Sequence, residues 1–165
     1  MAYVRGHRGD YDRWDRKGAK GWTYKDVLPY FRRMETFEGG EDTWRGGSGP
    51  VSVRKGSYPT ELYDIFIEAG RQAGHPVTND INGEVQEGFG AFQMNVKDGV
   101  RASTAKAYLR PNIGRKNLTV LTECLVDQLV FEGNRVVGVN YTQSGGGSST
   151  AIAAREVILA AGATN

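Results

Sequence analysis

The chain has 165 residues, of which 39% are hydrophobic, and this length allows one compact domain that buries about 70% of its unfolded surface. Lysine and arginine number 21 against 19 acidic residues, and the two signs are interleaved instead of forming a basic stripe, which argues against a nucleic-acid partner. Cys124 is the only cysteine, which excludes an intrachain disulfide and a clustered-thiolate metal site and favours a reducing compartment such as the cytoplasm.

Two helices are predicted in the first half of the chain. The first spans residues 23–35, where Thr23 can cap the helix and Asp26 lies three residues further on. Pro29 lies inside this helix and should kink or delay it. The second helix spans residues 59–73, because apolar side chains recur there at spacings of three and four, and Gly74 is placed to end it.

Short strands are predicted around the second helix. The glycine-rich residues 39–49 predict a loop that leads into a strand at residues 50–54. Beyond the helix, apolar residues alternate with polar ones along residues 89–96, which indicates a single strand, and a turn follows at residues 98–99. Ser103 can then cap a short helix that reaches Leu109.

The last third of the chain is rich in predicted strands. Apolar and β-branched residues favour strands at residues 118–122, 124–131 and 136–143, with a hairpin turn at Gly133-Asn134. Residues 144–149 predict a flexible loop, and residues 156–160 predict a buried strand. The elements together predict a mixed α/β (α+β) fold.

Few residues point to chemistry on their own. His7 and His75 lie far apart without metal-site spacing, and we interpret both as surface or turn histidines. We interpret the carboxylate pairs Glu41-Asp42 and Glu84 with Glu87 as solvated surface. No nucleophile elbow, zinc motif or phosphate-binding loop is present, and no apolar run approaches the roughly 20 residues of a membrane-spanning helix. These residues alone therefore predict a domain without a self-contained active site.

A series of sequence blocks, in order along the chain, nevertheless resembles the glucose-methanol-choline (GMC) oxidoreductase family, and in particular its bacterial choline dehydrogenase branch. The blocks are MAYVRG (1–6), DYDRW (10–14), GWTY (21–24), DVLPYF (26–31), GSGPVSV (47–53), NG (82–83), QEGFG (86–90), RASTA (101–105), AYLRP (107–111), NLTVLT (117–122), FEG (131–133) and REVILAAGA (155–163). They cover nearly the whole chain in the family's order. The resemblance implies an internal fragment of the N-terminal half of such an enzyme.

The resemblance implies FAD as cofactor and a small-molecule alcohol as substrate. It carries over four cofactor-binding positions, Val126 through its backbone, Met1 and Ala2 at the end of a loop along the flavin, and Gly162 where the backbone can approach closely. An ordinary strand valine and an ordinary turn glycine are the alternatives for Val126 and Gly162. No catalytic residue and no metal ligand are assigned. The family's G-x-G-x-x-G turn and its catalytic histidine have no counterpart here, so we expect this chain alone to be inactive.

The resemblance also implies which parts of the chain belong to the cofactor side and which to the substrate side. Residues 1–46 and 103–165 are assigned to the FAD-binding, Rossmann-like side, and residues 47–102 to the substrate-binding side. The implied function is oxidation of the CH-OH group of a primary alcohol, choline or a related compound, with hydride transfer to flavin. A non-catalytic binding or structural module that kept part of the fold is the alternative, and a stand-alone adenine-nucleotide binder is a weaker one.

Two structural expectations follow. Residues 118–143 should form adjacent antiparallel strands of the cofactor domain, in a different sheet from residues 89–96. In a chain cut from a larger enzyme, the side chains of Val157, Ile158 and Leu159 should be exposed.

Overall fold

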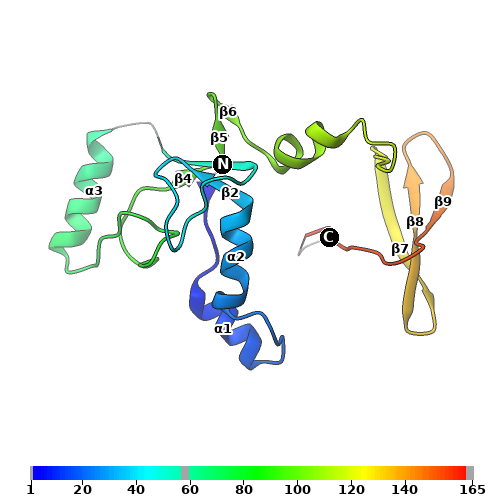
Figure 1. Cartoon of the computed structure of the whole chain (residues 1–165), viewed down its shortest axis with the longest axis horizontal. Helices are drawn as coiled ribbons and strands as arrows, with labels where there is room; N and C mark the ends of the chain where they lie inside the picture. The colour runs from blue at the N-terminus through cyan, green and yellow to red at the C-terminus, as the bar shows by residue number, and fades with distance from the viewer. Residues whose placement is uncertain (1, 57–59, 163–165) are drawn as a thin grey trace. The chain divides into compact units, whose positions relative to one another are not determined.

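The computed structural model describes residues 2–56 and 60–162 (Figure 1). The chain divides into two compact units, Met1–Asn112 and Ile113–Asn165. Within the described ranges, no helix is long and apolar enough to cross a membrane.

A four-stranded sheet organises the first unit, in the order β1-β4-β3-β2. Its strands are β1 (Ala2–Tyr3), β2 (Glu35–Phe37), β3 (Val51–Lys55) and β4 (Gln93–Met94). Only the β2–β3 pair is parallel. The buried core of the sheet is small and consists of Tyr3, Phe37, Val51 and Val53. The sheet therefore brings the beginning of the chain next to segments about 50 and 90 residues further on.

Helix α2 (Tyr24–Met34) confirms the first predicted helix (Figure 1). Thr23 and Asp26 form the capping box, because the Thr23 hydroxyl accepts from the Asp26 amide at 3.3 Å and the Asp26 carboxylate accepts from the Thr23 amide at 3.0 Å. Pro29 lies inside the helix and does not delay its start. At Glu35 the backbone turns to extended geometry, and the chain passes directly into β2.

Helix α3 (Glu61–Gln72) confirms the second predicted helix, with Thr60 as its N-cap. Most of its apolar side chains are exposed; these are Leu62, Tyr63, Ile65 and Phe66. The helix is held at Gly70, because a Cβ there would lie 2.5 Å from the Phe89 ring. Helix α3 therefore packs on Phe89 through Gly70 and through the Phe66 ring, whose centroid lies 5.0 Å from that of Phe89, and most of its other apolar side chains are exposed within the described structure.

Several elements of the first unit were not predicted, among them strands β1 and β2 and helix α1. Helix α1 (Arg8–Arg16) has no buried residue, so it lacks the apolar stripe on which a prediction from periodicity depends. Strand β2 has three residues, too few to display an alternating pattern. Strand β2 forms by pairing with β3, a contact between distant segments that local sequence does not encode.

The prediction of one strand over residues 89–96 is wrong. The chain forms β4 and then β5 (Val96–Lys97), which belong to different sheets and are separated by Asn95. Strand β5 pairs with β6 (Val100–Arg101) across the predicted turn, where Asp98 and Gly99 both have positive φ, as a tight hairpin requires. A π-helix, η1 (Ala105–Leu109), and a 3₁₀ turn, η2 (Arg110–Asn112), follow; the Ser103 hydroxyl accepts from the Lys106 amide, as predicted.

The second unit is an antiparallel meander of three strands, β7 (Cys124–Glu132), β8 (Arg135–Gln143) and β9 (Ser148–Ile152) (Figure 1). The predicted hairpin turn at Gly133 is confirmed, with Gly133 at a φ of 59°. The loop predicted at residues 144–149 is too long, because Ser148 and Ser149 already belong to β9. The meander and β4 lie in different sheets, as expected.

The strands predicted at residues 118–122 and 156–160 are wrong for this structure. Neither segment has strand geometry, although both have apolar sequences. A strand requires a neighbour for its backbone hydrogen bonds, and the described residues supply none at these segments. The exposure prediction is confirmed for Ile158 and Leu159, which are 83% and 69% exposed, whereas Val157 is half-buried.

Candidate functional site

The predicted cofactor positions lie at exposed edges of the two units. Ala2 is exposed in β1 of the first unit, and Val126 and Gly162 are exposed in the second unit. Met1 lies outside the described residues. The structure thus leaves the surface of three of the four predicted positions open to a ligand.

Val126 occupies a place that suits a main-chain contact. It lies on β7, an edge strand of the meander, so one side of its backbone has no strand neighbour in the described structure. Val126 pairs with Tyr141 and Gln128 pairs with Asn140, which makes Asp127 the extra residue of a β-bulge. A bulge interrupts regular pairing and re-aims the backbone beside it. The geometry therefore fits a cofactor that binds to backbone atoms at Val126.

Gly162 has a φ of 95°, a conformation that side-chain-bearing residues rarely adopt. A Cβ at this position would meet no atom within 4 Å. The glycine is therefore favoured by its backbone conformation, and the open space beside it is compatible with both of its predicted roles.

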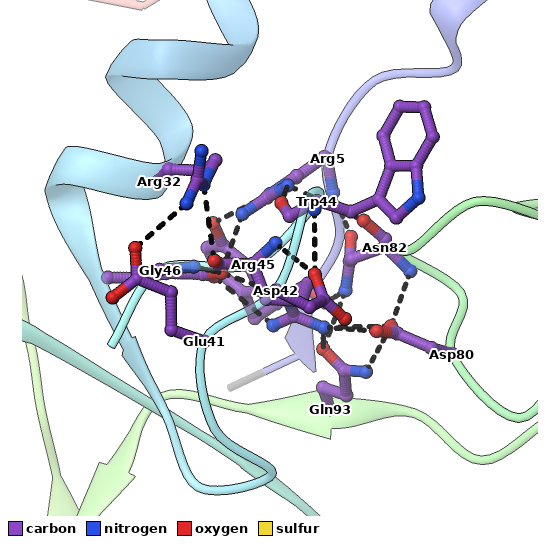
Figure 2. A network of polar contacts seen from close by, with 12 residues as sticks. Arg5, Arg32, Glu41, Asp42, Trp44, Arg45, Gly46, Asp80, Asn82 and Gln93 are labelled. Carbon is purple, nitrogen blue, oxygen red and sulfur yellow. Dashed lines mark hydrogen bonds and ion pairs between the residues drawn. The ribbon is translucent and has the colours of Figure 1, made fainter.

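A buried polar network supports the sheet of the first unit (Figure 2). Glu35 is fully buried between two arginines. Its Oε1 accepts from Arg5 Nη2 at 2.6 Å, from Arg45 Nε at 2.8 Å and from the Gly46 amide at 2.9 Å. The Arg45 guanidinium also stacks on the Phe37 ring, 3.7 Å from its centroid. Two buried cations thus share one carboxylate.

Asp80 supplies the second negative charge. Arg45 Nη1 donates to both Asp80 oxygens, at 2.8 and 2.9 Å, and Gln93 Nε2 donates to Oδ1 at 2.6 Å (Figure 2). Burial raises the pKa of the Asp80 carboxyl, but the hydrogen bond from the Asn82 amide and the nearby Arg45 outweigh it, so that the pKa is lowered. The charges of the four ionised residues balance.

Internal pairing makes this network a support and not a reactive centre. Burial opposes the charge of Arg5, yet its contacts with Tyr3 and Glu35 raise the pKa of the guanidinium. Sequence reasoning missed the network because its members are scattered over 90 residues. The sequence offered one signal, which is Gly46 in the predicted glycine-rich loop. This glycine permits a close approach of the loop to α2, since a Cβ there would lie 1.8 Å from the Arg32 carbonyl oxygen.

A cleft of about 410 Å³ lies beside the segment that follows β1. Val4, Phe92 and Ile81 provide apolar walls, and His7 and Glu87 provide a polar part. His7 is also the N-cap of α1: its Nδ1 accepts from the Gly9 amide, which leaves the Nε2 proton directed at Glu87 Oε1, 3.5 Å away. His7 therefore has a local structural role, in agreement with its interpretation from sequence.

A larger cleft of about 640 Å³ lies between α1 and α2. Trp14, Trp22 and Tyr30 line it, together with other aromatic and apolar side chains. Among the described residues, Asp26 is the only charged one that lines this cleft, and its carboxylate is engaged in the capping box. Because no free charge marks this cleft for a particular ligand, we assign it none.

Val126, Gly162 and Ala2 are each exposed on their own unit, which leaves each of them open to the contact with FAD that the family resemblance implies. The sequence contains no G-x-G-x-x-G, the turn that would bind a pyrophosphate at a helix N-terminus. Among the described residues, no cluster of side chains could hold a metal ion.

Solved structures define the class of this fold. Pyridoxine 4-oxidase from Mesorbium loti superposes with a TM-score of 0.83 at 33% identity, over 92% of this chain and 30% of that one. An FAD-dependent oxidoreductase from Chaetomium thermophilum gives a TM-score of 0.81 at 26% identity, over 93% of this chain and 29% of that one. The mixed α/β fold is that of FAD-binding oxidoreductases, as predicted.

The sequence comparison identifies the family. Residues 1–165 match the GMC oxidoreductase family, and the chain belongs to it. It is 48% identical over its whole length to the oxygen-dependent choline dehydrogenase of Brucella anthropi and to the mitochondrial choline dehydrogenase of Homo sapiens. The chain spans 30% and 28% of the lengths of these relatives. The predicted family is confirmed.

Proposed function

We propose that this chain is part of an FAD-dependent oxidoreductase that oxidises the CH-OH group of a primary alcohol, with choline as the first candidate. One observation carries the proposal: all 165 residues align at 48% identity with proteins named choline dehydrogenases. The match covers every residue of the chain, so the aligned region includes the surface loops as well as the core. It therefore favours a shared function over a shared fold alone.

The chain's contribution is to position the cofactor and part of the substrate side. Bound flavin would supply the redox chemistry by accepting hydride from the alcohol carbon at its N5 atom. Val126 would contact the adenine through its backbone, Met1 and Ala2 would lie along the flavin, and Gly162 would allow a close approach. Residues 1–46 and 103–165 are assigned to the cofactor side and residues 47–102 to the substrate side.

The experiment uses the whole enzyme that contains this chain. Purified enzyme is mixed anaerobically with choline, a simple alkyl alcohol or an aryl alcohol, and the flavin absorbance is followed. Bleaching of a stoichiometrically bound flavin by choline, with the corresponding aldehyde as product, is the expected result. Reduction by another primary alcohol alone would replace choline as substrate and retain the reaction class.

A non-catalytic binding or structural module is the competing hypothesis. It predicts that the whole protein binds no flavin, or binds a flavin that no alcohol reduces. Either result, in protein with a cooperative melting transition, would overturn the proposed function.

A further inference from the structure

Two side-chain amides hold the segment between β1 and α1. The Asn82 side chain accepts from the Arg5 amide through Oδ1 at 2.6 Å and donates from Nδ2 to the Tyr3 carbonyl at 3.0 Å. The Gln86 side chain accepts from the Arg8 amide through Oε1 at 3.0 Å and donates from Nε2 to the Gly6 carbonyl at 3.2 Å. Each amide therefore binds a carbonyl and the N–H two residues further along.

This pattern replaces a missing strand partner. Strand β1 has only two residues, so its pairing with β4 fixes little of the chain that follows. A primary amide presents one acceptor and two donors in a plane, and it can satisfy the backbone groups that flank a single residue. Asn82 flanks Val4 in this way, and Gln86 flanks His7. Both of these residues line the 410 Å³ cleft.

The loop that carries the two amides is itself held firmly. Its base is closed by hydrogen bonds from the Thr78 amide to the Phe89 carbonyl at 2.9 Å and from the Phe89 amide to the Pro76 carbonyl at 2.8 Å. Its middle is tied to the buried network, because Asp80 binds Arg45 and the Asn82 side chain donates to Gln93 Oε1 at 2.9 Å (Figure 2). The amides therefore extend from a fixed support.

We infer that Asn82 and Gln86 are positioning residues that hold the segment from Tyr3 to Arg8 in register and so set the cleft wall formed by Val4 and His7. The inference rests on the proposed function, which places Met1 and Ala2, directly before this segment, along the flavin. The position of one wall of the flavin site would then depend on the two amides, although neither amide touches the flavin.

The test substitutes acids of the same shape in the whole enzyme. Asn82→Asp and Gln86→Glu keep an oxygen that can accept from Arg5 or Arg8, but each replaces the donor to a backbone carbonyl with an oxygen. Gln72→Glu makes the same chemical change on exposed α3, where the Gln72 amide binds only Glu68. It is the matched control.

We expect Asn82→Asp and Gln86→Glu to retain flavin. In both variants, alcohol should reduce the flavin about 10- to 100-fold more slowly, and the visible spectrum and midpoint potential of the flavin should change. Gln72→Glu should match the unsubstituted enzyme in all three. A purely structural role would lower the melting midpoint and leave the potential and spectrum of the folded enzyme unchanged.

Hydrogen exchange supplies a readout that does not require turnover. In the unsubstituted enzyme the Arg8 amide should be protected, and Gln86→Glu should increase its exchange rate at least 10-fold. Gln86 is half-buried, so this variant is expected to fold even if Asn82→Asp does not.

The two hypotheses fail in different ways. Unsubstituted enzyme that binds no reducible flavin contradicts the proposed function. A normal unsubstituted enzyme whose Gln86→Glu variant keeps the Arg8 protection, the reduction rate and the potential overturns the positioning role.

Discussion

The side chain of Glu35 makes several of the buried polar contacts in the first unit. It is the shared partner of Arg5 and Arg45, and all three side chains are fully buried. Pairing of this kind adds little net stability, because desolvation offsets the attraction between the charges. Removing one partner lowers the stability, because the remaining charges stay buried without compensation.

We therefore expect Glu35→Ala to lower the free energy of unfolding of the first unit by about 3–5 kcal/mol. Glu41→Ala, which removes the exposed partner of Arg32, should cost only about 0–1 kcal/mol and serves as the control. Tryptophan fluorescence during urea unfolding measures the difference, because Trp14, Trp22 and Trp44 all lie in the first unit. Equal losses for the two variants would contradict the importance of the buried network.

Asp80 links this network to pH. Because its pKa is lowered in the folded chain from an ordinary value of 3.8, its contribution to stability is complete above that value and declines as the pH falls through the folded pKa. Asp80→Asn should therefore destabilise the first unit at pH 7, and its deficit should shrink as the pH falls below about 4. Urea midpoints of both proteins between pH 7 and pH 3 measure this; a constant deficit would show that Asp80 does not titrate as described.

At the scale of elements, α2 is the helix whose sequence and structure agree most closely. Its capping box satisfies two backbone N–H groups, one at Thr23 and one at Asp26. Thr23→Ala should cost about 1 kcal/mol, whereas Thr23→Ser keeps the hydroxyl and should cost far less. The same fluorescence-detected unfolding separates them, and a Ser variant as weak as the Ala variant would argue against the cap.

The elements also show which features a sequence can predict. Helices α2 and α3 and the β7–β8 hairpin were predictable because caps, apolar spacing and a turn glycine are local signals. Helix α1 has no buried residue, strand β2 depends on pairing with the distant β3, and within the described residues the apolar segments 118–122 and 156–160 lack a pairing partner. Of the candidate site, Val126, Ala2 and Gly162 came from family resemblance, whereas the amides of Asn82 and Gln86 acquire their role only when the loop folds against the beginning of the chain.

At the scale of the whole molecule, the sequence lacks the G-x-G-x-x-G turn that would bind the pyrophosphate of FAD. We expect the 165-residue chain alone to retain no FAD and to show no alcohol-dependent dye reduction. For a competent site, FAD at about 100 times its dissociation constant would stabilise the fold by about 2.7 kcal/mol and raise the melting midpoint by several degrees. Melting curves with and without FAD, with the whole enzyme as positive control, provide the test; a stoichiometric yellow complex of the chain would contradict the expectation.

The open edge of the meander has a consequence for how the protein behaves in a crowded solution. Strands β7 and β9 both end the sheet, and Val126, Phe131 and Ile152 are more than half exposed on them. An uncovered edge with apolar side chains is a template on which a second copy can add its own strand, and this is a route to aggregation. The bulge at Asp127 breaks the regular spacing of that template, and the Asp127 carboxylate accepts a hydrogen bond from the Thr142 hydroxyl on β8 at 2.8 Å. The bulge that interrupts regular pairing on β7 thus also acts as a safeguard against growth of the sheet from chain to chain.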